Sequence, residues 1–275
     1  MQDKVTASIV IYKNRLDMLQ KAVQSFLDST TDSTLYLIDN SPTNAYEQHF
    51  KHRRIRYVFN NKNIGFGAGH NIALKDVLKK NTASYHIILN PDVYFGPDVL
   101  DQLHAYMDAN SQVGLVMPKV LYPDGRLQPL CKLLPSPFTL FTRRFLQFYP
   151  YYIKRLNHLY EMHFSGYNRV MDVPFLSGCF MFLRLDALRE VGLFDERIFL
   201  YTEDTDLTRR IHKRYRTIFF PEVTVYHYNQ RGSYKNVIIL LHHILSAIKY
   251  FNKWGWFNDS ERKFINRQIL IRFSK

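Results

Sequence analysis

Cysteine is nearly absent from the sequence. Cys131 and Cys179 are the only two cysteines among 275 residues. Two cysteines are too few for a disulfide framework, and their spacing is not that of a metal site. A reducing cytoplasm is therefore the simplest setting for the chain.

Hydrophobic runs long enough to cross a membrane are absent as well. A spanning helix needs about 18 or more consecutive apolar residues, and no uncharged stretch of that length occurs. The first residues, MQDKVTASIVIYKN, enter an apolar strand pattern at once and lack the long apolar core of a secretion signal. We therefore expect a chain that does not span a membrane.

Acidic residues are outnumbered by basic ones. Lys plus Arg number 37 against 24 Asp plus Glu, which gives a net charge of +13. Such an excess favours a partner that carries phosphate: nucleic acid, an anionic membrane surface or a phosphorylated ligand. A hydrophobic content of 46% argues against disorder. No linker is evident, so one domain with a C-terminal extension is favoured over two domains.

Apolar runs and helical patterns alternate through the first half of the chain. Strands are predicted at residues 7–12, 35–38, 55–59, 87–89 and 113–117, with helical patterns at 16–27, 68–80 and 99–107. This alternation predicts an α/β fold with a mostly parallel sheet and helices on both faces. Ligands of such sheets bind at the carboxyl ends of the strands, which here carry Tyr12, Asp39, Asn60 and Asp92.

The sharpest of these strand ends is Asn90-Pro91-Asp92. Proline fixes the turn, so Asp92 projects from a rigid edge. A carboxylate held there suits Mg²⁺, which usually takes one or two carboxylates together with phosphate oxygens. The alternative is that Asp92 only forms the turn. Asp39 has the same two interpretations: a ligand for a base or ribose, or a residue that caps the turn at Asn40 and Ser41.

A glycine-rich loop is predicted at residues 63–71, just before a helix. Its backbone amides and the helix start could approach a phosphate or nucleoside closely. The pattern is not GxGxxG, and glycine-rich turns before helices are common, so a purely structural loop is the alternative.

Residues 176–214 form the stretch around which we expect the chain to be organised. Glu203 and Asp204 follow a strand-like apolar segment at 199–201 and begin a helical pattern whose end is rich in bases. One interpretation is a helix that complements its own dipole. The other is a pair of catalytic carboxylates, because a strand end leading into a helix is where an α/β fold exposes such groups. His227 ends a later strand and is either an edge residue or a ligand for metal or phosphate.

Two later stretches combine aromatic and basic residues. Residues 138–159 interleave aromatics with arginine and lysine, and residues 237–251 read as a helix with an apolar face. The neighbouring Lys249, Lys253, Trp254 and Trp256 would suit a lipid headgroup boundary. The alternative is core helices with a solvated basic face.

Four motifs in order carry a family resemblance. The segments IGFGAGHNIAL, LNPDV, FLSGCFMFLRLDALREVGLFDERIFLYTEDTDLTRRI and FPEVTVYHYNQRGS closely resemble the family-2 glycosyltransferases of GT-A fold, over roughly residues 6–233. Within that family the chain looks most like rhamnosyltransferases of bacterial O-antigen and cell-wall polysaccharide assembly. The resemblance implies a nucleotide-diphospho-sugar donor, with dTDP-L-rhamnose favoured, a divalent metal (Mg²⁺ or Mn²⁺), and inversion at the anomeric carbon. It gives a GT-A domain at 1–233 and a C-terminal helical extension at 234–275.

The resemblance also assigns roles to single residues. Asp204 resembles the catalytic base, Glu203 stands beside it, and Gly178 lies in the acceptor-side turn. We expect Glu203 to raise the pKa of Asp204 by like-charge repulsion. Asp92 and His227 correspond to residues that hold the metal or diphosphate, although Asn90 stands where a first carboxylate is common. The predicted donor-binding residues are Tyr12, Asp39, Gly65, Gly67, Asn71, Asn90 and Asp92.

The implied acceptor is a lipid-linked saccharide, and the expected location is the cytoplasm, peripheral to the inner face of the cell membrane. No nucleic-acid partner is expected, because no recognition motif for one is present. Three alternatives stay open: a glycosyltransferase with another nucleotide-sugar donor, a nucleotidyltransferase that releases pyrophosphate, and a basic membrane- or RNA-binding module without catalysis.

Overall fold

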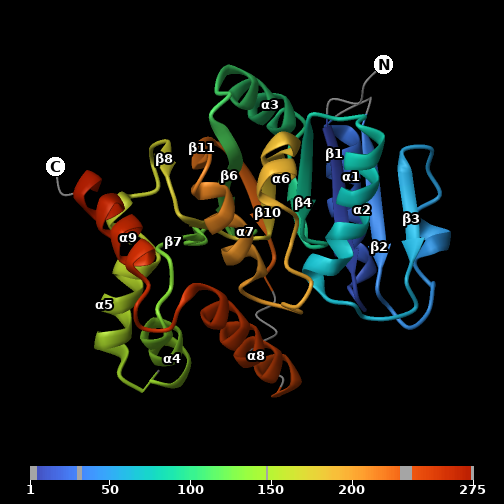
Figure 1. Cartoon of the computed structure of the whole chain (residues 1–275). Coiled ribbons are helices and arrows are strands. Elements are labelled where there is room, and N and C mark those ends of the chain that lie inside the picture. Colours follow the sequence, from blue (N-terminus) through green and yellow to red (C-terminus); the bar gives the residue numbers. More distant parts are fainter. Residues whose placement is uncertain (1–4, 30–32, 147, 230–236, 274–275) are drawn as a thin grey trace.

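A central mixed sheet organises the molecule, shown in Figure 1 as a computed structural model that describes residues 5–29, 33–146, 148–229 and 237–273. Its strand order is β3-β2-β1-β4-β10-β6-β11-β5, with β8 paired to β11. The strands are β1 (Val5–Ile11), β2 (Thr34–Asp39), β3 (Ile55–Phe59), β4 (Tyr85–Leu89), β5 (Val93–Phe95), β6 (Val113–Leu121), β8 (Met171–Asp172), β10 (Phe180–Arg184) and β11 (Arg216–His227). A separate small sheet pairs β7 (Cys131–Lys132) with β9 (Phe175–Leu176).

The sheet is mostly parallel, as the sequence predicts. Strands β3, β2, β1 and β4 pair in parallel, and β11 is parallel to β6. Strand β10 is inserted antiparallel between β4 and β6, so β6 and β11 run in the same direction as β4. The strand order reverses beside β1, which places a ligand crevice at the carboxyl ends of β1 and β4.

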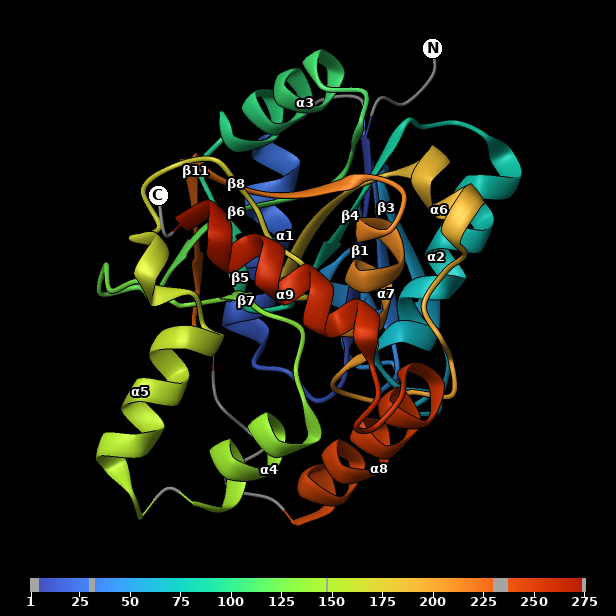
Figure 2. The same cartoon turned by 60° about the vertical axis from the view of Figure 1, so that its left-hand side comes forward.

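Helices cover both faces of the sheet, and a C-terminal pair packs beside it. The helices are α1 (Leu16–Asp28), α2 (Phe66–Lys80), α3 (Val99–Ala109), α4 (Pro137–Phe145), α5 (Pro150–Tyr160), α6 (Leu185–Val191), α7 (Glu203–His212), α8 (Val237–Trp254) and α9 (Ser260–Phe273). In Figure 2, α2, α6 and α7 lie in front of the sheet and α1 lies behind it. Both views show α4, α5 and α8 together on one side of the molecule.

Two sequence predictions of local structure are wrong. Helix α2 already begins at Phe66, so the predicted glycine-rich loop ends at Gly65, whose backbone φ of 92° no other residue adopts easily. Residues 199–201 are not a strand, because Tyr201 and Thr202 both have left-handed backbone angles that interrupt an extended chain. The predicted domain boundary at residue 233 lies outside the described residues.

Strand β1 is buried on both faces, which explains its nearly continuous apolar sequence. Its two buried hydroxyls are exceptions, and each is satisfied by a histidine. Thr6 Oγ1 lies 2.8 Å from Nδ1 of His86, and Ser8 Oγ joins His86 Nε2 (2.8 Å) to His70 Nδ1 (2.7 Å). This chain of hydrogen bonds ties β1 to β4 and α2 inside the core.

The buried histidine pair predicts a loss of stability in acid. Burial lowers the pKa of His86 to about 3 and that of His70 well below its usual 6.5. The unfolded chain takes up protons below pH 6.5, whereas the folded chain does not, so stability is full above that pH and falls toward pH 3. Together the two histidines remove at most about 4 kcal/mol between pH 7.5 and pH 5, measurable by urea unfolding.

His70→Leu should reduce this loss by about half, because Ser8 keeps its bond to His86 and one titrating ring is gone. The exposed His49 provides a control: His49→Leu should retain the full loss. An unchanged pH dependence in His70→Leu would contradict the assignment.

Candidate active site

A cavity of about 380 Å³ lies where several loops meet beyond β4, β10 and β11. Its lining includes five residues that the sequence singled out: Asn90, Gly178, Glu203, Asp204 and His227. Asp92 lies beside this cavity, with its Oδ1 atom 3.3 Å from Nε2 of His227. Segments far apart in the chain thus converge on one site.

Asp204 occupies the first turn of α7 and is held by backbone hydrogen bonds. Its Oδ2 accepts from the Gly178 N–H at 2.9 Å, and its Oδ1 accepts from the Thr205 N–H at 2.7 Å. A Cβ on Gly178 would lie 3.1 Å from Cβ of Asp204, tighter than an ordinary contact. Glycine at 178 therefore lets the backbone approach the carboxylate closely.

The two adjacent carboxylates differ in protonation. Burial and then the charge of Asp204 raise the pKa of Glu203 well above its usual 4.5, and Glu203 Oε2 is buried without a hydrogen-bond partner. Glu203 is therefore neutral. Burial also raises the pKa of Asp204, but the Gly178 N–H and the charge of Lys132 oppose it. The like-charge repulsion between the two carboxylates favours holding one proton on the pair, and it contributes to the raised pKa of Glu203.

His227 lies between two oxygen acceptors. Its Nδ1 is 3.0 Å from Oε1 of Gln128, whose amide nitrogen donates to the His227 carbonyl at 2.6 Å. Its Nε2 faces Asp92. Burial alone would lower the pKa of His227, but its hydrogen bond to Asp92 contributes to a net rise to about 10. Position Nε2 therefore holds either a proton or a cation.

Asp92 and His227 fit two of the ligand positions of a divalent metal, with the other positions filled by the substrate and water. Adjacent ligands of an octahedral Mg²⁺ with bonds of about 2.1 Å lie about 3 Å apart, close to the 3.3 Å between Asp92 and His227. Among the described residues, no group of three or more His, Cys, Asp or Glu side chains could hold a metal. Diphosphate and water oxygens would have to supply the remaining ligands, as is usual for Mg²⁺.

Asp39 ends β2 but is fully buried. Its Oδ1 accepts from the Ser41 N–H at 2.8 Å, and its Oδ2 accepts from the Tyr57 hydroxyl. In this structure Asp39 therefore acts as the residue that caps the turn at Asn40 and Ser41. A nucleoside could reach its carboxylate only after Tyr57 turned away. Tyr12, just after β1, is 45% exposed and open to a ligand.

Gly67 and Asn71 make close contacts with Phe194 and its neighbours. A Cβ on Gly67 would lie 2.8 Å from Cβ of Phe194. The Asn71 amide is buried, donates to the Phe194 carbonyl and to Glu196 at 2.9 Å each, and accepts from the Phe194 N–H at 3.1 Å. A Cβ on Gly65 would lie 2.5 Å from the Phe199 carbonyl oxygen. These residues hold the segment leading to Glu203, and both amide hydrogens of Asn71 are used within the protein.

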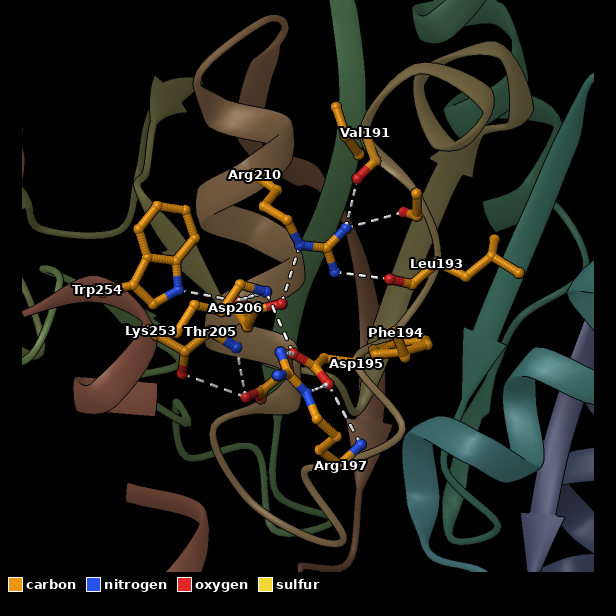
Figure 3. A network of polar contacts seen from close by, with 12 residues as sticks. Val191, Leu193, Phe194, Asp195, Arg197, Thr205, Asp206, Arg210, Lys253 and Trp254 are labelled. Atoms are coloured by element: carbon orange, nitrogen blue, oxygen red, sulfur yellow. Dashed lines mark hydrogen bonds and ion pairs between the residues drawn. The ribbon is translucent and has the colours of Figure 1, made fainter. Parts of the chain in front are cut away.

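The side of α7 that faces the C-terminal segment is held by a polar network, shown in Figure 3. Asp206 is fully buried and accepts from Arg210 (2.9 Å), Lys253 (2.7 Å) and Trp254 Nε1 (2.8 Å). Arg210 also donates to the carbonyls of residues 191–193. Lys253 and Trp254 thus face α7, so their predicted place at a lipid boundary is wrong. Their polar atoms are already committed inside the protein.

Arg209 adds a second anchor to the C-terminal segment. Its guanidinium is 1% exposed and donates to both oxygens of Asp259 at 2.7 Å and to Glu261 at 2.8 Å. It also lies 4.1 Å from the Trp254 ring. Removing one partner of such a buried pair typically costs about 3–5 kcal/mol, so α7 is held firmly from behind.

The cavity contains residues that the sequence did not assign to it. Lys132 of β7 and His243 of α8 line it together with Arg143 and Arg144 of α4. Lys132 stands in the run CKLL and has no motif that could have revealed it. The two arginines belong to the aromatic and basic stretch at 138–159, which the sequence related only to a membrane or a core.

The aromatic side chains of that stretch are largely exposed. Exposed apolar side chains on α4, α5 and α8 include Phe138, Phe141, Phe145, Tyr151, Leu241 and Leu245. The prediction of simple core helices therefore fails for these faces, although Tyr250 and Phe251 of α8 are buried. No helix in the described part of the chain is long and apolar enough to cross a membrane.

Comparison with known families and proteins gives consistent matches. Residues 8–192 match the model of glycosyl transferase family 2, which is more than half of the chain. An N-acetylglucosaminyl-diphospho-decaprenol L-rhamnosyltransferase of Mycobacterium tuberculosis (strain CDC 1551 / Oshkosh) is 26% identical over 263 residues, covering 87% of this chain and 81% of the relative.

Solved structures show the same fold at lower identity. GalNAc-T7 with UDP, GalNAc and Mn²⁺ superposes with a TM-score of 0.62 and 14% identity, over 82% of this chain and 43% of that one. A mannosyltransferase from Pyrobaculum calidifontis with GDP-Man and Mn²⁺ gives 0.59 and 16%, over 90% of this chain and 65% of that one. These likenesses establish the GT-A fold that the sequence resemblance predicted.

The neutral state of Glu203 predicts that Glu203→Gln stabilises the protein at neutral pH. The unfolded chain releases this proton above about pH 4.5, whereas the folded chain keeps it, so the wild type loses stability as pH rises from there. Glutamine abolishes this loss, and the gain at pH 7 should approach about 3 kcal/mol at most and vanish near pH 4.5. Urea unfolding at both pH values measures this gain in the free energy of unfolding.

The exposed Glu222 is the matched control, and Glu222→Gln should show no such gain. A Glu203→Gln protein that is less stable than wild type at pH 7 would refute the argument.

Proposed function

Because the chain belongs to glycosyl transferase family 2 and is a glycosyltransferase, we propose that it transfers L-rhamnose from dTDP-L-rhamnose to a hydroxyl of a lipid-linked saccharide, with inversion. The M. tuberculosis rhamnosyltransferase supports this choice of sugar and of acceptor class. The observation that carries the proposal is the meeting of Asp204 with His227 in one cavity, with Asp92 paired to His227 beside it.

The donor would lie along the carboxyl ends of the strands. In this arrangement Tyr12 and Asp39 lie at the nucleoside end, and Asn90, Asp92 and His227 lie at the diphosphate. The sugar then reaches the cavity at Asp204. The order β2, β1, β4 supports this path, because neighbouring strands deliver these residues in the same sequence along one edge.

Asp204 would act as the base that takes the proton from the attacking acceptor hydroxyl. The N–H groups of Gly178 and Thr205 hold its carboxylate in one orientation, and burial raises its pKa toward the range useful for proton transfer. The neutral Glu203 adds no second negative charge. Gly178 lies at the acceptor side, where its lack of a side chain leaves room.

Asp92 and His227 would hold a divalent metal, Mg²⁺ or Mn²⁺, together with the donor diphosphate. When bound, the metal supplies positive charge that stabilises the departing nucleoside diphosphate. His227 must then give up its Nε2 proton, while its Nδ1 keeps the hydrogen bond to Gln128. The presence of Mn²⁺ in two of the comparison structures supports the use of a divalent metal.

We propose a peripheral location on the cytoplasmic face of the membrane, with a GT-A domain at 1–233 and a helical extension at 234–275. Exposed aromatic and aliphatic side chains on α4, α5 and α8 support this, since all three helices lie on one side of the molecule (Figure 1). The net charge of +13 favours an anionic surface.

A donor panel tests the function. Purified protein is incubated with dTDP-, UDP- and GDP-sugars and a lipid-linked saccharide, and release of the nucleoside diphosphate is measured. We expect turnover with dTDP-L-rhamnose that is lost on chelation of divalent metal and in Asp92→Ala. Turnover only with a different donor would overturn the choice of dTDP-L-rhamnose. Turnover that is unaffected by chelation and by Asp92→Ala would overturn the metal site.

Asp204→Asn tests the base. The isosteric amide keeps the size of the side chain but cannot take a proton, so kcat should fall by about 10²- to 10⁴-fold. The dissociation constant of the nucleoside diphosphate, measured by calorimetry, should stay within about twofold, because a base contributes to transfer and not to nucleotide binding. Wild-type turnover in this variant would remove Asp204 from the role.

A further inference from the structure

Glu203 is a buried polar residue of the catalytic cavity whose side chain has no contact assigned to it above. It lines the cavity and is 4% exposed. No residue in the described part of the chain makes a hydrogen bond with its Oε2 atom. A polar group buried without a partner is costly, and folded proteins rarely contain one. The carboxyl of Glu203 therefore calls for a partner from outside the chain.

The backbone on both sides of Glu203 is held in place. Thr202, directly before it, has a left-handed φ of 64°, and its hydroxyl donates to the Ser246 carbonyl of α8 at 3.2 Å. Asp204, directly after it, accepts from the Gly178 N–H at 2.9 Å. These anchors fix Glu203 before a substrate arrives, so a partner gains a contact at little cost in ordering the chain.

The protonation state of Glu203 selects the kind of partner. Burial and then the charge of Asp204 raise the pKa of Glu203 well above its usual 4.5, so the group is a neutral carboxyl at pH 7. A neutral carboxyl has one O–H that donates and oxygens that accept. A metal ion suits an ionised carboxylate, and a phosphate group suits a cation. A sugar hydroxyl both donates and accepts, so it is the group that complements Glu203.

The place of Glu203 favours a hydroxyl of the acceptor. Consecutive residues of a helix point about 100° apart, so Glu203 and Asp204 can contact two neighbouring groups of one molecule. In the proposed function Asp204 meets the attacking hydroxyl, and the nucleoside end of the donor lies at β1 to β3. Helix α8, to which Thr202 is bonded, lies apart from those strands in Figures 1 and 2.

We propose that the carboxyl of Glu203 binds a second hydroxyl of the acceptor sugar, adjacent to the one that attacks, and thereby selects the acceptor and orients it toward Asp204. This inference deepens the proposed function and rests on it for the reaction and for the base. The Glu203 O–H donates to the acceptor oxygen and keeps its proton, so Glu203 determines specificity and takes no part in proton transfer.

Deoxy acceptors test this assignment. Each member of the set lacks one hydroxyl of the terminal sugar and is otherwise identical to the full acceptor. The member that lacks the attacking hydroxyl gives no product and so identifies that position. In the wild type, loss of a hydroxyl next to it should lower kcat/KM by about 10-fold, because the carboxyl of Glu203 is then left unpaired.

Glu203→Met and Glu203→Gln separate the hydrogen bond from the shape of the side chain. Methionine has no comparable donor or acceptor, so kcat/KM for the full acceptor should fall about 10-fold and equal that for the deoxy acceptor within about twofold. Glutamine keeps a donor and an acceptor, so it should retain a preference of about 5-fold or more. The dissociation constant of dTDP should stay within about twofold in both variants, which also shows that they fold.

Glu222→Met is the matched control. Glu222 is exposed on β11, so the same change there should leave the preference of the wild type intact. If the wild type uses every deoxy acceptor that still reacts as well as the full acceptor, the proposal is overturned and water is the partner of Glu203. A preference that survives in Glu203→Met would belong to other residues and would overturn the proposal as well.

Deoxy analogues of the donor sugar distinguish the two sugars that meet in the cavity. A preference that Glu203→Met abolishes for donor analogues alone would place the contact on the transferred sugar and refute the acceptor site. Release of nucleoside diphosphate separates this inference from the proposed function. Release that shows no preference for a second acceptor hydroxyl refutes the inference and leaves the function standing.

Calorimetry tests the site without turnover, so it applies even if no donor of the panel is used. In the presence of dTDP, loss of at least one acceptor hydroxyl should weaken binding by about 10-fold in the wild type and should have no effect in Glu203→Met. Equal losses in both proteins would refute the site.

Discussion

The hydrogen bond from the Gly178 backbone to Asp204 is the constraint on which the site depends. It joins the turn before β10 to the first turn of α7, and it exists because position 178 has no side chain to separate them. A buried carboxylate is costly unless donors meet it. The Gly178 and Thr205 N–H groups do so, and the positive end of the α7 dipole adds to them. Asp204 can therefore be both buried and fixed.

The rest of the molecule keeps α7 from moving away from that bond. Asp206 and Arg209 lie on the side of α7 that faces the C-terminal segment and are satisfied there by Lys253, Trp254 and Asp259. Buried ion pairs contribute little net stability, because desolvation offsets their attraction, but separating one partner from the other is costly. Helices α8 and α9 thus belong to the support of the site as much as the sheet does.

Sequence patterns predicted the parts that local chemistry determines. Strands β1 to β4 are short apolar runs ended by turn residues, and α7 has carboxylates at its start and bases at its end, so both could be read directly. The role of Asn71 could not, because its partner Phe194 is 123 residues away. Strand β7 has two residues, too few for any periodicity, which hid Lys132. Asp39 has the same sequence context as a ligand or as a turn residue; only its contacts to Ser41 and Tyr57 distinguish the two.

The charges around Asp204 are balanced in a way that suits a base. Burial alone would raise its pKa until it stayed protonated and could accept nothing, while full exposure would leave it too weak. Lys132 and two N–H groups oppose burial, and the neutral Glu203 keeps a second negative charge out of the cavity.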